Sequence, residues 1–435
     1  MSTVAVLLAA GLGTRMKSAL PKALHRIAGR PMLNHLIAQC EAVFDRVVVV
    51  VGPGMETVAQ AAAPHTVVVQ QERLGTAHAA LQAEAAFGDG EVAVLYADNP
   101  LIRTETMRRL LAARPEGGLA LLAMRAADPG RYGRVIVHDG FVERIVEWAE
   151  ATDAERSVGL CNAGVMCASA DDFRRWLRAV QPSAAKGEFY LTDCVALANT
   201  EGRRVTAVEA PWEELRGVNS RVELAEAEAA VQSWMRIAAM EAGVTLTEPG
   251  SVQFSWDTEL AADVTVGPNV VFGPGVAVET GAEIRAFSHL EGCRVGRGAV
   301  VGPFARLRPG TVLEAEVHIG NFVEVKATRV GRGAKANHLT YLGDSEVGEK
   351  TNIGAGTITC NYDGFNKFQT KIGARVFVGT ASVLVAPVRL GDGAFVAAGS
   401  VVTRDVPADA MTFGRAQQVD KPGRAAAFRA GKEKK

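Results

Sequence analysis

The stretch VGPNVVFGPGVAVETGAEI, residues 266–284, decides the fold of the second half of the chain. An aliphatic or aromatic residue returns in it every six positions, and Gly often follows. The rhythm continues to Val402, with most steps of six residues and a few of five. Its members are Val266, Phe272, Val278, Ile284, Leu290, Val295, Val301, Leu307, Leu313, Ile319, Val325, Val330, Ala336, Leu342, Val347, Ile353, Thr359, Ile372, Val378, Leu384, Leu390, Val396 and Val402. Such regularity predicts a repeat architecture.

Each hexad predicts a short strand and a turn, and three hexads close one triangular coil with the aliphatic residue pointing inward. This is the hexapeptide pattern of a parallel β-helix, although the pattern alone does not give the hand of the coil. The rhythm is interrupted between Thr359 and Ile372. We therefore expect Cys360–Thr370 to form a loop that leaves the coil. Most such insertions are tolerated surface excursions, but the polar residues around this one favour a function.

Residues 1–220 follow a different pattern, in which short aliphatic runs alternate with helix-like segments. The expected strands are Val4–Ala9, Val47–Val51, Thr66–Val69, Val92–Tyr96, Gly118–Met124 and Val205–Val208. Helices are expected over Met32–Val43, Thr76–Ala86 and Thr104–Ala113. This alternation predicts an α/β domain with a mainly parallel sheet. Residues 134–147 and the segment around 162–166 look antiparallel, as an added region that covers a substrate would.

A long helix is predicted between these two parts. Val222–Ala242 is rich in Ala and Glu and contains no Gly or Pro, and Gly243 supplies a stop. We therefore expect an N-terminal domain over 1–220, a linker helix over 221–243 and a repeat domain over 244–435 that ends in a short C-terminal tail.

Composition excludes several classes of protein. The chain has 435 residues, which favours two or three domains, and a net charge of −1, which argues against a nucleic-acid coat or a binder of anionic membranes. No apolar run is long enough to span a membrane, and the run at Val4–Ala10 is too short for a signal peptide. The six cysteines show no C-x-x-C pairing, so we expect reduced thiols in a cytoplasmic protein.

A glycine-containing loop follows the first predicted strand, in the string LLAAGLGTRM over residues 7–16. Small residues there let backbone N–H groups approach a triphosphate, and Arg15 can neutralise further charge. Lys22 supplies a second cation close behind. A bare G-x-G is equally typical of an ordinary strand-to-helix turn, but the two nearby cations favour a phosphate site.

Polar strings interrupt the hexads, although a β-helix needs no such residues to fold. They occupy 306–310, 321–326, 337–344 and 352–364, roughly one coil apart, so they can stack along one edge. His338 lies in the third of these strings and is a candidate proton acceptor, because imidazole titrates near neutrality. A lone histidine more often makes a structural hydrogen bond, as we expect for His289 and His318.

The strings LAAGLGTRM and PK, followed by Gln70, LGTAH (74–78), LYADNPL (95–101), YGR (132–134), IVE (145–147), NAG (162–164), EFYLTD (188–193) and GVN (217–219), resemble those of sugar-1-phosphate nucleotidyltransferases. Together with HLTYLGD (338–344) and the hexapeptide region, nearly the whole chain resembles the bacterial bifunctional N-acetylglucosamine-1-phosphate uridyltransferase/glucosamine-1-phosphate N-acetyltransferase family. The resemblance implies an α/β, Rossmann-like nucleotidyltransferase domain, a long linker helix and a left-handed parallel β-helix, assembled as a homotrimer.

The resemblance also implies a first set of site residues, for transfer of UMP from UTP to N-acetylglucosamine-1-phosphate with release of pyrophosphate. Asp98 and Asn219 would hold Mg²⁺, and Arg15 and Lys22 would steady the phosphates. The other nucleotide and sugar contacts would be Leu8, Ala9, Ala10, Gly11, Gln70, Gly75, Thr76, Tyr96, Ala97, Gly133, Glu147 and Asn162. His78 is tempting as a base, but we expect a structural role because phosphate oxygens need no base.

A second set is implied for the preceding step, acetyl transfer from acetyl-CoA to glucosamine-1-phosphate. His338 would be the base, with Glu324 orienting nearby groups. Glucosamine-1-phosphate would meet Arg308, Lys326, Tyr341 and Asn352. Acetyl-CoA would meet Ala355, Asn361, Tyr362, Lys367, Thr380, Ala398 and Arg415. In the trimer, the inserted loop would complete a neighbour's site.

The chain departs from the family pattern at four positions. Ala97 stands where Gly is usual, Ala163 where Thr is usual, Ala149 where a basic residue is common and Thr380 where Ser is usual. Two other interpretations stay open at this point. One is a single-activity nucleotidyltransferase whose β-helix regulates or oligomerises, and the other is a β-helix that is only an interaction scaffold. Both explain the hexads, but neither explains the polar strings.

Overall fold

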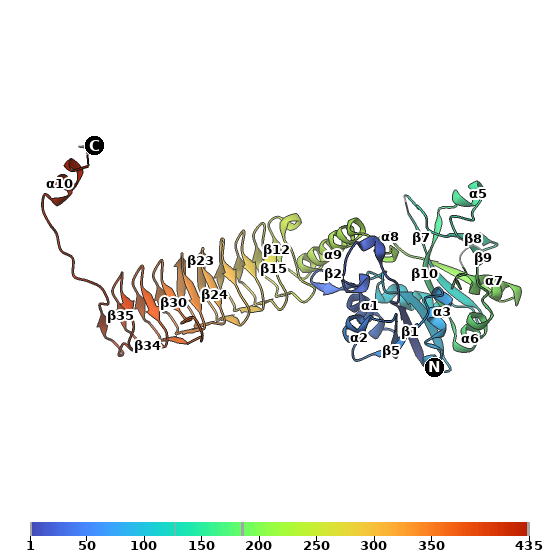
Figure 1. Ribbon diagram of the computed structural model, residues 1–435, viewed down its shortest axis with the longest axis horizontal. Coiled ribbons are helices and arrows are strands. Elements are labelled where there is room, and N and C mark those ends of the chain that lie inside the picture. The colour runs from blue at the N-terminus through green and yellow to red at the C-terminus, as the bar shows by residue number, and fades with distance from the viewer. Residues whose placement is uncertain (1, 127, 184–186, 433–435) are drawn as a thin grey trace. The chain divides into compact units, whose positions relative to one another are not determined.

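The computed structural model describes residues 2–126, 128–183 and 187–432. The chain forms two compact units, Met1–Trp234 and Met235–Lys435, and the division falls inside helix α9 (Arg221–Glu241). Figure 1 shows the α/β unit and the β-helix as separate bodies of different construction. The fold class expected from the sequence is therefore confirmed: a Rossmann-like unit, a long helix and a left-handed parallel β-helix.

The first unit contains a nine-stranded sheet whose main path runs β11-β7-β10-β6-β1-β4-β5. Its strands are β1 (Thr3–Leu8), β4 (Arg46–Val51), β5 (Thr66–Val69), β6 (Glu91–Tyr96), β7 (Leu119–Arg125), β10 (Leu160–Ser169) and β11 (Val205–Glu209). The six predicted strands are all present, and β6, β1, β4 and β5 are mutually parallel. The aliphatic sequences of β1, β4 and β6 suit strands that are buried on both faces, whereas β5, at the end of the sheet, is only partly buried.

The antiparallel part of the sheet differs from expectation. β8 (Arg134–His138) and β9 (Phe141–Val146) form the expected hairpin. β10, however, lies in the middle of the sheet, antiparallel to both β6 and β7, so its interpretation as part of an added covering region is wrong. Its small and sulfur-containing residues (LCNAGVMCAS) lack the β-branched signature of its neighbours, which explains why it did not read as a central strand.

Helices cover both faces of this sheet. One face packs against α1 (Met32–Glu41), α2 (Glu56–Ala61) and α4 (Thr104–Ala112), and the other against α3 (Thr76–Leu81), α6 (Ala170–Ala179) and α7 (Asp193–Thr200). The helix predicted over Thr76–Ala86 ends at Leu81 and is followed by a 3-10 turn at Glu84–Ala86. Because both faces are covered, ligands can reach the sheet only at the edge where the parallel strands end.

The second unit is a triangular coil of three parallel sheets with 10, 8 and 8 strands. The first sheet contains β12 (Thr245–Leu246), β14 (Thr265–Val266), β17 (Glu283–Ile284), β20 (Val300–Val301), β23 (His318–Asn321), β26 (Lys335–His338), β29 (Asn352–Ile353), β32 (Phe377–Val378), β35 (Phe395–Val396) and β37 (Met411–Thr412). The second contains β13 (Glu259–Leu260), β16 (Ala277–Val278), β19 (Cys293–Val295), β22 (Thr311–Leu313), β25 (Arg329–Val330), β28 (Ser345–Val347), β31 (Thr370–Ile372) and β34 (Val388–Leu390). The third contains β15 (Val271–Phe272), β18 (His289–Leu290), β21 (Arg306–Leu307), β24 (Glu324–Lys326), β27 (Tyr341–Gly343), β30 (Ile358–Cys360), β33 (Val383–Val385) and β36 (Val401–Val402).

The hexad positions form the core of this coil. Each of the predicted inward residues is buried, with at most 5% of its surface exposed. The predicted loop is also present: Val330 pairs with Val347 after 17 residues, whereas Val347 pairs with Ile372 after 25. The extra residues lie between β30 and β31, where Phe365 is 90% exposed. Stacking of inward aliphatic residues thus holds the coil, and the insertion leaves it without breaking the ladder.

The C-terminal tail carries one further helix, α10 (Arg424–Ala430), whose residues are exposed. The last three residues of the predicted tail lie outside the described residues. Within the described ranges, no helix combines the length and the apolar character needed to cross a lipid bilayer.

Candidate functional site

The loop after β1 provides the floor of a site in the first unit. The chain leaves β1 at Leu8 and turns into the 3-10 helix η1 (Thr14–Met16) through Gly13, whose φ is 62°. A Cβ at Gly13 would lie 2.5 Å from the Cβ of Lys22, so a larger residue would push Lys22 away. Glycine here lets the loop and the lysine pack against each other, as a phosphate site built from both requires.

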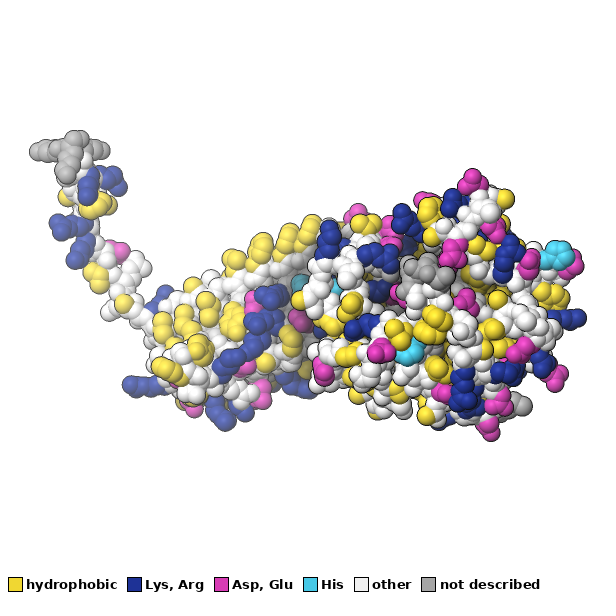
Figure 2. Space-filling model, turned by 45° about the vertical axis from the view of Figure 1, so that its right-hand side comes forward, with side chains coloured by type: hydrophobic (Ala, Val, Ile, Leu, Met, Phe, Trp, Pro, Cys, Tyr) yellow, Lys and Arg dark blue, Asp and Glu magenta, His cyan; other side chains and the backbone are white. Residues whose placement is uncertain are grey.

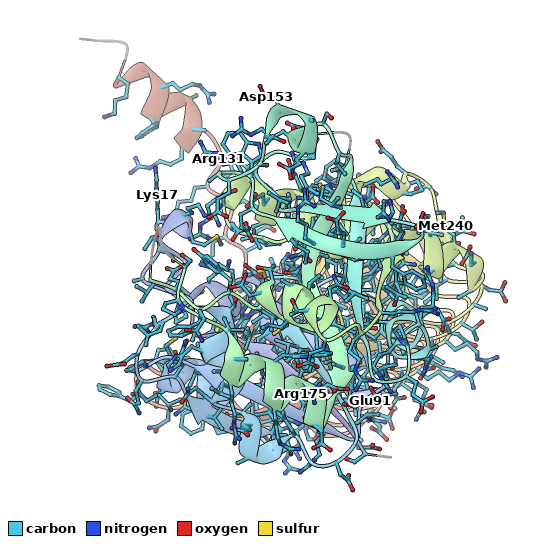
Figure 3. The ribbon with its side chains drawn as sticks, turned by 90° about the vertical axis from the view of Figure 1, so that its right-hand side faces the viewer. Lys17, Glu91, Arg131, Asp153, Arg175 and Met240 are labelled. Carbon is cyan, nitrogen blue, oxygen red and sulfur yellow. The ribbon has the colours of Figure 1, made fainter. Side chains whose placement is uncertain are left out.

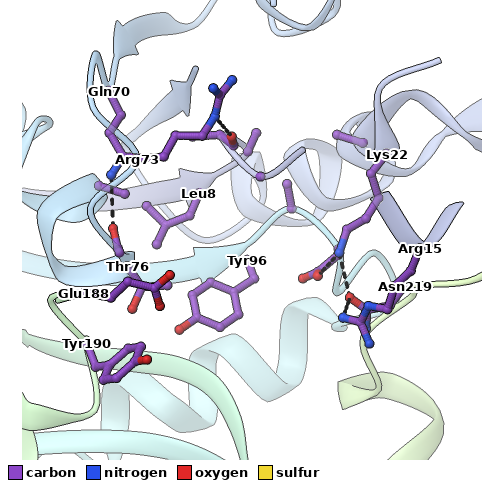
Figure 4. A pocket seen from close by; sticks show the side chains of 18 residues that line it. Leu8, Arg15, Lys22, Gln70, Arg73, Thr76, Tyr96, Glu188, Tyr190 and Asn219 are labelled. Carbon is purple, nitrogen blue, oxygen red and sulfur yellow. Dashed lines mark hydrogen bonds and ion pairs between the residues drawn. The ribbon is translucent and has the colours of Figure 1, made fainter. Parts of the chain in front are cut away.

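A cavity of about 420 Å³ opens over this loop (Figure 4). It is lined by Arg15 and by twelve more of the residues predicted for the uridyltransferase site: Leu8, Ala9, Ala10, Gly11, Lys22, Gln70, Gly75, Thr76, Tyr96, Ala97, Asp98 and Asn219. They come from β1, from the loop after it with the 3-10 helices η1 and η2 (Lys22–Leu24), from the ends of β5 and β6, from the start of α3 and from the segment before α9. The fold therefore gathers at one sheet edge residues that are far apart in sequence.

Cations and oxygen acceptors meet at one end of this cavity (Figure 4). Lys22 Nζ donates to a carboxylate oxygen of Asp98 and, at 2.8 Å, to Oδ1 of Asn219. Arg15 Nη2 donates to the same Asn219 oxygen at 2.8 Å. The segment that carries Asn219 is fixed because the Val218 amide donates to the Asp98 carbonyl at 2.8 Å. The side chains of Arg15 and Lys22 thus meet the oxygen atoms of Asp98 and Asn219 at this end of the cavity.

This oxygen pair fits a divalent ion that is shared with a ligand. The Lys22 ammonium lies between the Asp98 and Asn219 oxygens, which shows that both oxygens face one cation-sized position. Among the described residues no three His, Cys, Asp or Glu side chains come together as a metal cluster. Two hard oxygen ligands cannot fill an octahedron, but Mg²⁺ usually keeps several waters and takes substrate phosphates as its other ligands.

A second group of contacts fixes the side of the cavity that is lined by Gln70, Gly75 and Thr76. Gln70 Nε2 donates to the Gly75 carbonyl and lies 3.1 Å from His78 Nδ1. Gly75 has φ 110°, and a Cβ there would lie 2.5 Å from the Phe189 carbonyl oxygen. The 188–191 segment therefore sits directly on this loop. His78 uses Nδ1 for Gln70 and Nε2 for Gln82, at 3.3 Å, so its contacts are structural.

A second cavity, of about 740 Å³, adjoins the first and shares Tyr96, Asp98 and Asn219 with it. Its lining adds the three remaining residues predicted for sugar and ribose, Gly133, Glu147 and Asn162. Tyr96 packs against Gly164, where a Cβ would lie 2.2 Å from its ring. Burial raises the pKa of Tyr96, so its phenol stays protonated and can donate a hydrogen bond into the cavity.

Several lining residues were not assigned from the sequence, among them Arg73 and Glu188 in the first cavity, Arg131 in the second and Tyr190 in both. Glu188 and Tyr190 lie in the quoted string EFYLTD, so their signal was present but not assigned. Arg73 Nε donates to the Ala10 carbonyl at 2.8 Å, and its guanidinium lies against Gly52. Of the departures from the family pattern, Ala97 lines the first cavity and Ala149 and Ala163 line the second.

One edge of the β-helix carries the second set of predicted residues. Backbone amides link successive coils at this edge: Leu339 to Asn321, Gly356 to His338, Ala381 to Ala355 and Gly399 to Thr380, with N···O distances between 2.7 and 3.4 Å. His338, Ala355, Thr380 and Ala398 therefore lie one above the other, and Arg415 lies against Gly399 at the end of the row. This row, His338–Ala355–Thr380–Ala398–Arg415, is called the corner row below.

His338 is oriented by its neighbour on the preceding coil. Asn321 and His338 are in register between β23 and β26, and His338 Nδ1 lies 2.9 Å from Asn321 Oδ1. The amide oxygen can only accept, so the proton resides on Nδ1. Nε2 then keeps its lone pair at an exposed side chain. This is the tautomer that a proton acceptor needs.

A charged cluster lies beside His338 on the third sheet. Arg308 Nη1 donates to Glu324 Oε1 at 2.9 Å, and Lys326 Nζ lies 3.2 Å from Asp344. Asn361, at the root of the inserted loop, donates to the same Asp344 carboxylate and lies 3.4 Å from the Tyr341 hydroxyl. Each predicted phosphate-binding cation thus has an acidic partner, and Asp344 was not assigned from the sequence.

The structure shows the surroundings of three more of the predicted acetyltransferase residues. Lys367, expected at coenzyme A, lies beside Lys326, and this contact lowers the pKa of Lys367. Asn352, expected beside Tyr341, lies on the first sheet in register with Lys335. Tyr362 projects from the inserted loop and is 60% exposed. Lys367 therefore lies near the Lys326–Asp344 pair of the same chain.

Comparison with protein families supports this two-part organisation. Residues 5–163 match the MobA-like NTP transferase domain, and residues 369–404 match the hexapeptide repeat of succinyl-transferase. The two matches fall on the unit with the sheet-edge cavities and on the β-helix respectively.

Curated proteins similar to the whole chain share one name. The "Bifunctional protein GlmU" of Gluconacetobacter diazotrophicus is 64% identical over 99% of this chain and 95% of its own length. Proteins of that name from Granulibacter bethesdensis and Acidiphilium cryptum are 62% and 60% identical, over 98% and 100% of this chain and 96% and 100% of their own lengths. The similarity therefore extends through both units.

Proposed function

The chain belongs to the family of bifunctional GlmU proteins, and from this premise we propose how its two sites perform two consecutive reactions. It is a transferase of UDP-N-acetylglucosamine biosynthesis, which serves the cell wall. It transfers acetyl from acetyl-CoA to glucosamine-1-phosphate, and then UMP from UTP to N-acetylglucosamine-1-phosphate with release of pyrophosphate. The second reaction uses a divalent metal ion, which we assign as Mg²⁺.

Uridylyl transfer is a displacement between anions. A phosphate oxygen of the sugar attacks the α-phosphorus of UTP and pyrophosphate leaves, so the site must neutralise charge and align the partners in line. Arg15, Lys22 and the amides of the Gly11–Gly13 loop bind the phosphates, while Asp98 and Asn219 would hold Mg²⁺, which would offset phosphate charge. Lys22 then exchanges its contact with Asp98 for a phosphate oxygen.

The two cavities divide the substrates between them. Gln70, Gly75 and Thr76 hold the uracil, since their amide, carbonyl and hydroxyl groups lie at one end of the first cavity. Gly133, Glu147 and Asn162 hold the sugar in the second cavity. Tyr96 and Asp98 line both cavities, so the reacting phosphates lie where the cavities meet.

Acetyl transfer uses the corner row. The amine of glucosamine-1-phosphate attacks the thioester carbonyl while His338 Nε2 takes its proton, and the tetrahedral intermediate then expels the coenzyme A thiolate, which is protonated. Arg308, Lys326 and, from its position, Lys367 bind the sugar phosphate. Tyr341 and Asn352 complete that pocket. The extended coenzyme lies along Ala355, Thr380, Ala398 and Arg415, with Asn361 and Tyr362 near the thioester.

We further propose that three copies assemble around the corner row. Phe287, Phe304 and Phe322 stack on successive coils at this edge, with ring centroids 4.9 and 5.4 Å apart, and about half of each side chain is exposed. Figure 2 shows hydrophobic side chains lined up along the β-helix. A continuous apolar row of this kind favours burial against a partner. The inserted loop then completes a neighbour's acetyl site.

A cytoplasmic location follows from the same proposal, because UTP and acetyl-CoA are supplied there. The six cysteines are free thiols and five of them are buried, in keeping with a reducing compartment.

The observation that carries the proposal is that one chain holds both the Arg15–Lys22–Asp98–Asn219 cluster and the Asn321–His338 pair. The test offers purified protein two substrate pairs. Acetyl-CoA with glucosamine-1-phosphate should release free thiol, and UTP with N-acetylglucosamine-1-phosphate and Mg²⁺ should release pyrophosphate. Pyrophosphate without thiol would leave only a nucleotidyltransferase with a regulatory or oligomerising β-helix. Release of neither would overturn the proposal.

A further inference from the structure

The sugar-side cavity has an unusual balance of charge for a site that receives a phosphate dianion. Its lining includes the carboxyl groups of Asp98, Glu147 and Glu150. Among the described residues that line it, Arg131 is the one basic side chain. Lys22 pairs with Asp98 where the two cavities meet, but Glu147 and Glu150 repel a sugar phosphate that enters this cavity, and among its lining residues only Arg131 can offset them.

The loop that carries Arg131 is fixed on both sides of it. The guanidinium of Arg134, which is 2% exposed, donates to the Gly130 carbonyl at 3.1 Å and to the Tyr132 carbonyl. The Tyr132 hydroxyl in turn accepts from the Gly217 amide at 3.2 Å. The backbone on both sides of Arg131 is therefore held in place by hydrogen bonds to other residues of the site. Figure 3 shows it beside helix α5 (Asp153–Arg156).

The side chain of Arg131 is held by an aromatic ring. Its guanidinium carbon lies 5.2 Å from the ring centroid of Trp148, another lining residue of the cavity. Arg156 braces the same indole, with its guanidinium carbon 4.7 Å from the centroid and its Nε donating to the Trp148 carbonyl at 3.3 Å. A stacked guanidinium keeps its in-plane N–H donors for other partners. No ion pair joins Arg131 to a carboxylate within the described ranges.

Ala149 follows Trp148 in the chain, lines the same cavity and carries no charge. We propose that Arg131 is a substrate-binding residue of the uridyltransferase site, and that it attracts and holds the sugar-1-phosphate anion with the positive charge that position 149 lacks. This inference rests on the proposed function of the site.

The first test is the variant Arg131→Ala in steady-state uridylyl transfer. We expect the KM for N-acetylglucosamine-1-phosphate to rise about tenfold, the effect of losing one charge-assisted contact. The KM for UTP and kcat should stay within about twofold, and added salt should weaken sugar-phosphate binding less than in the unaltered protein. Arg144→Ala is the matched control, because Arg144 lies on the neighbouring β9 and pairs with Glu143 and Glu155.

The second test moves the charge. Ala149→Lys added to Arg131→Ala should bring the KM for the sugar phosphate back to within about threefold of the original, because a cation returns to the same cavity. An unchanged KM in Arg131→Ala overturns the inference. So does a raised KM that Ala149→Lys leaves raised, since the loss is then one of loop structure rather than of charge.

Acetyl transfer by the same preparations separates this inference from the function on which it rests. It should be unchanged in all of these variants. If the unaltered protein forms no UDP-sugar, the proposed function fails. If it does form UDP-sugar and Arg131→Ala behaves like Arg144→Ala, only the role of Arg131 fails.

Discussion

The sheet-edge site and the corner row of the β-helix differ in shape, although both are proposed to bind substrates that carry phosphate. At the sheet edge, residues between Leu8 and Asn219 converge on two adjoining cavities of about 420 and 740 Å³. On the β-helix, residues between Arg308 and Arg415 lie on successive coils of one edge, and His338 is exposed. The first site is concave and the second is an open edge.

This difference has a consequence for assembly. A doubly covered sheet creates a cavity at the ends of its strands within one chain. The corner row lies along an exposed edge of the β-helix, so a site on this edge gains walls from a loop or from another copy. We therefore expect uridylyl transfer to survive dissociation into single chains and acetyl transfer to be lost.

The largest effect expected to sharpen this comparison is that of Asp98→Ala on uridylyl transfer. Loss of the one carboxylate in the cation cluster should lower kcat at least about 1,000-fold, because charge in the transition state is no longer balanced. Acetyl transfer, measured as thiol release, should remain within about twofold. Retained UDP-sugar synthesis would remove the metal-binding role of Asp98.

His338→Ala should separate the sites in the other direction. Loss of the general base should lower acetyl transfer about 100- to 10,000-fold, while pyrophosphate release is unchanged. Asn321→Ala should cost less, about tenfold, because the imidazole remains but its tautomer is no longer fixed. Near-normal acetylation by His338→Ala would rule out this residue as the base.

A charge in the apolar row tests the need for assembly. Phe304→Asp should dissociate the proposed trimer, seen by sedimentation velocity, and lower acetyl transfer about 50-fold or more, because burying an unpaired charge in the interface is costly. Uridylyl transfer should change less than about twofold. Val137→Asp, on the exposed hairpin of the first unit, is the matched control and should remain trimeric. A monomer that still acetylates would show that each β-helix edge is complete by itself.

The smallest effects are expected where the chain departs from its family. Ala97→Gly should change the KM for UTP by less than about threefold, because the Ala97 methyl already fits in a lined cavity and is 3% exposed. Thr380→Ser should change the KM for acetyl-CoA equally little, since the hydroxyl is kept. A tenfold change at either position would mean that the departure alters substrate binding.

Much of the fold followed from periodicity. The hexads predicted the core of the β-helix because a residue that recurs at every sixth position points to the inside of a triangular coil. Even Thr359, the polar member of the series, is fully buried. The interruption after Thr359 located the inserted loop. β10 was misplaced because periodicity shows that a segment is a strand but not which strands flank it, and its small residues resemble those of a turn-rich region.

The candidate site residues could be predicted where they belong to short sequence motifs. These motifs contain most of the residues that line both cavities, but they do not show which of those residues contact one another. Arg15 and Asn219, or Asp344 and Asn361, meet only through the fold. Arg131 and Asp344 were not predicted as site residues for a related reason. Their roles depend on the charges of residues that are neighbours in space, and these cannot be read from the spacing of residues in the sequence.

The most direct test of the account is one product analysis by mass spectrometry with glucosamine-1-phosphate, acetyl-CoA, UTP and Mg²⁺ supplied together. The unaltered protein should accumulate UDP-N-acetylglucosamine, Asp98→Ala should stop at N-acetylglucosamine-1-phosphate, and His338→Ala should leave glucosamine-1-phosphate unreacted. If either variant makes the final UDP-sugar, or if both variants stop at the same compound, the assignment of one reaction to each site is contradicted.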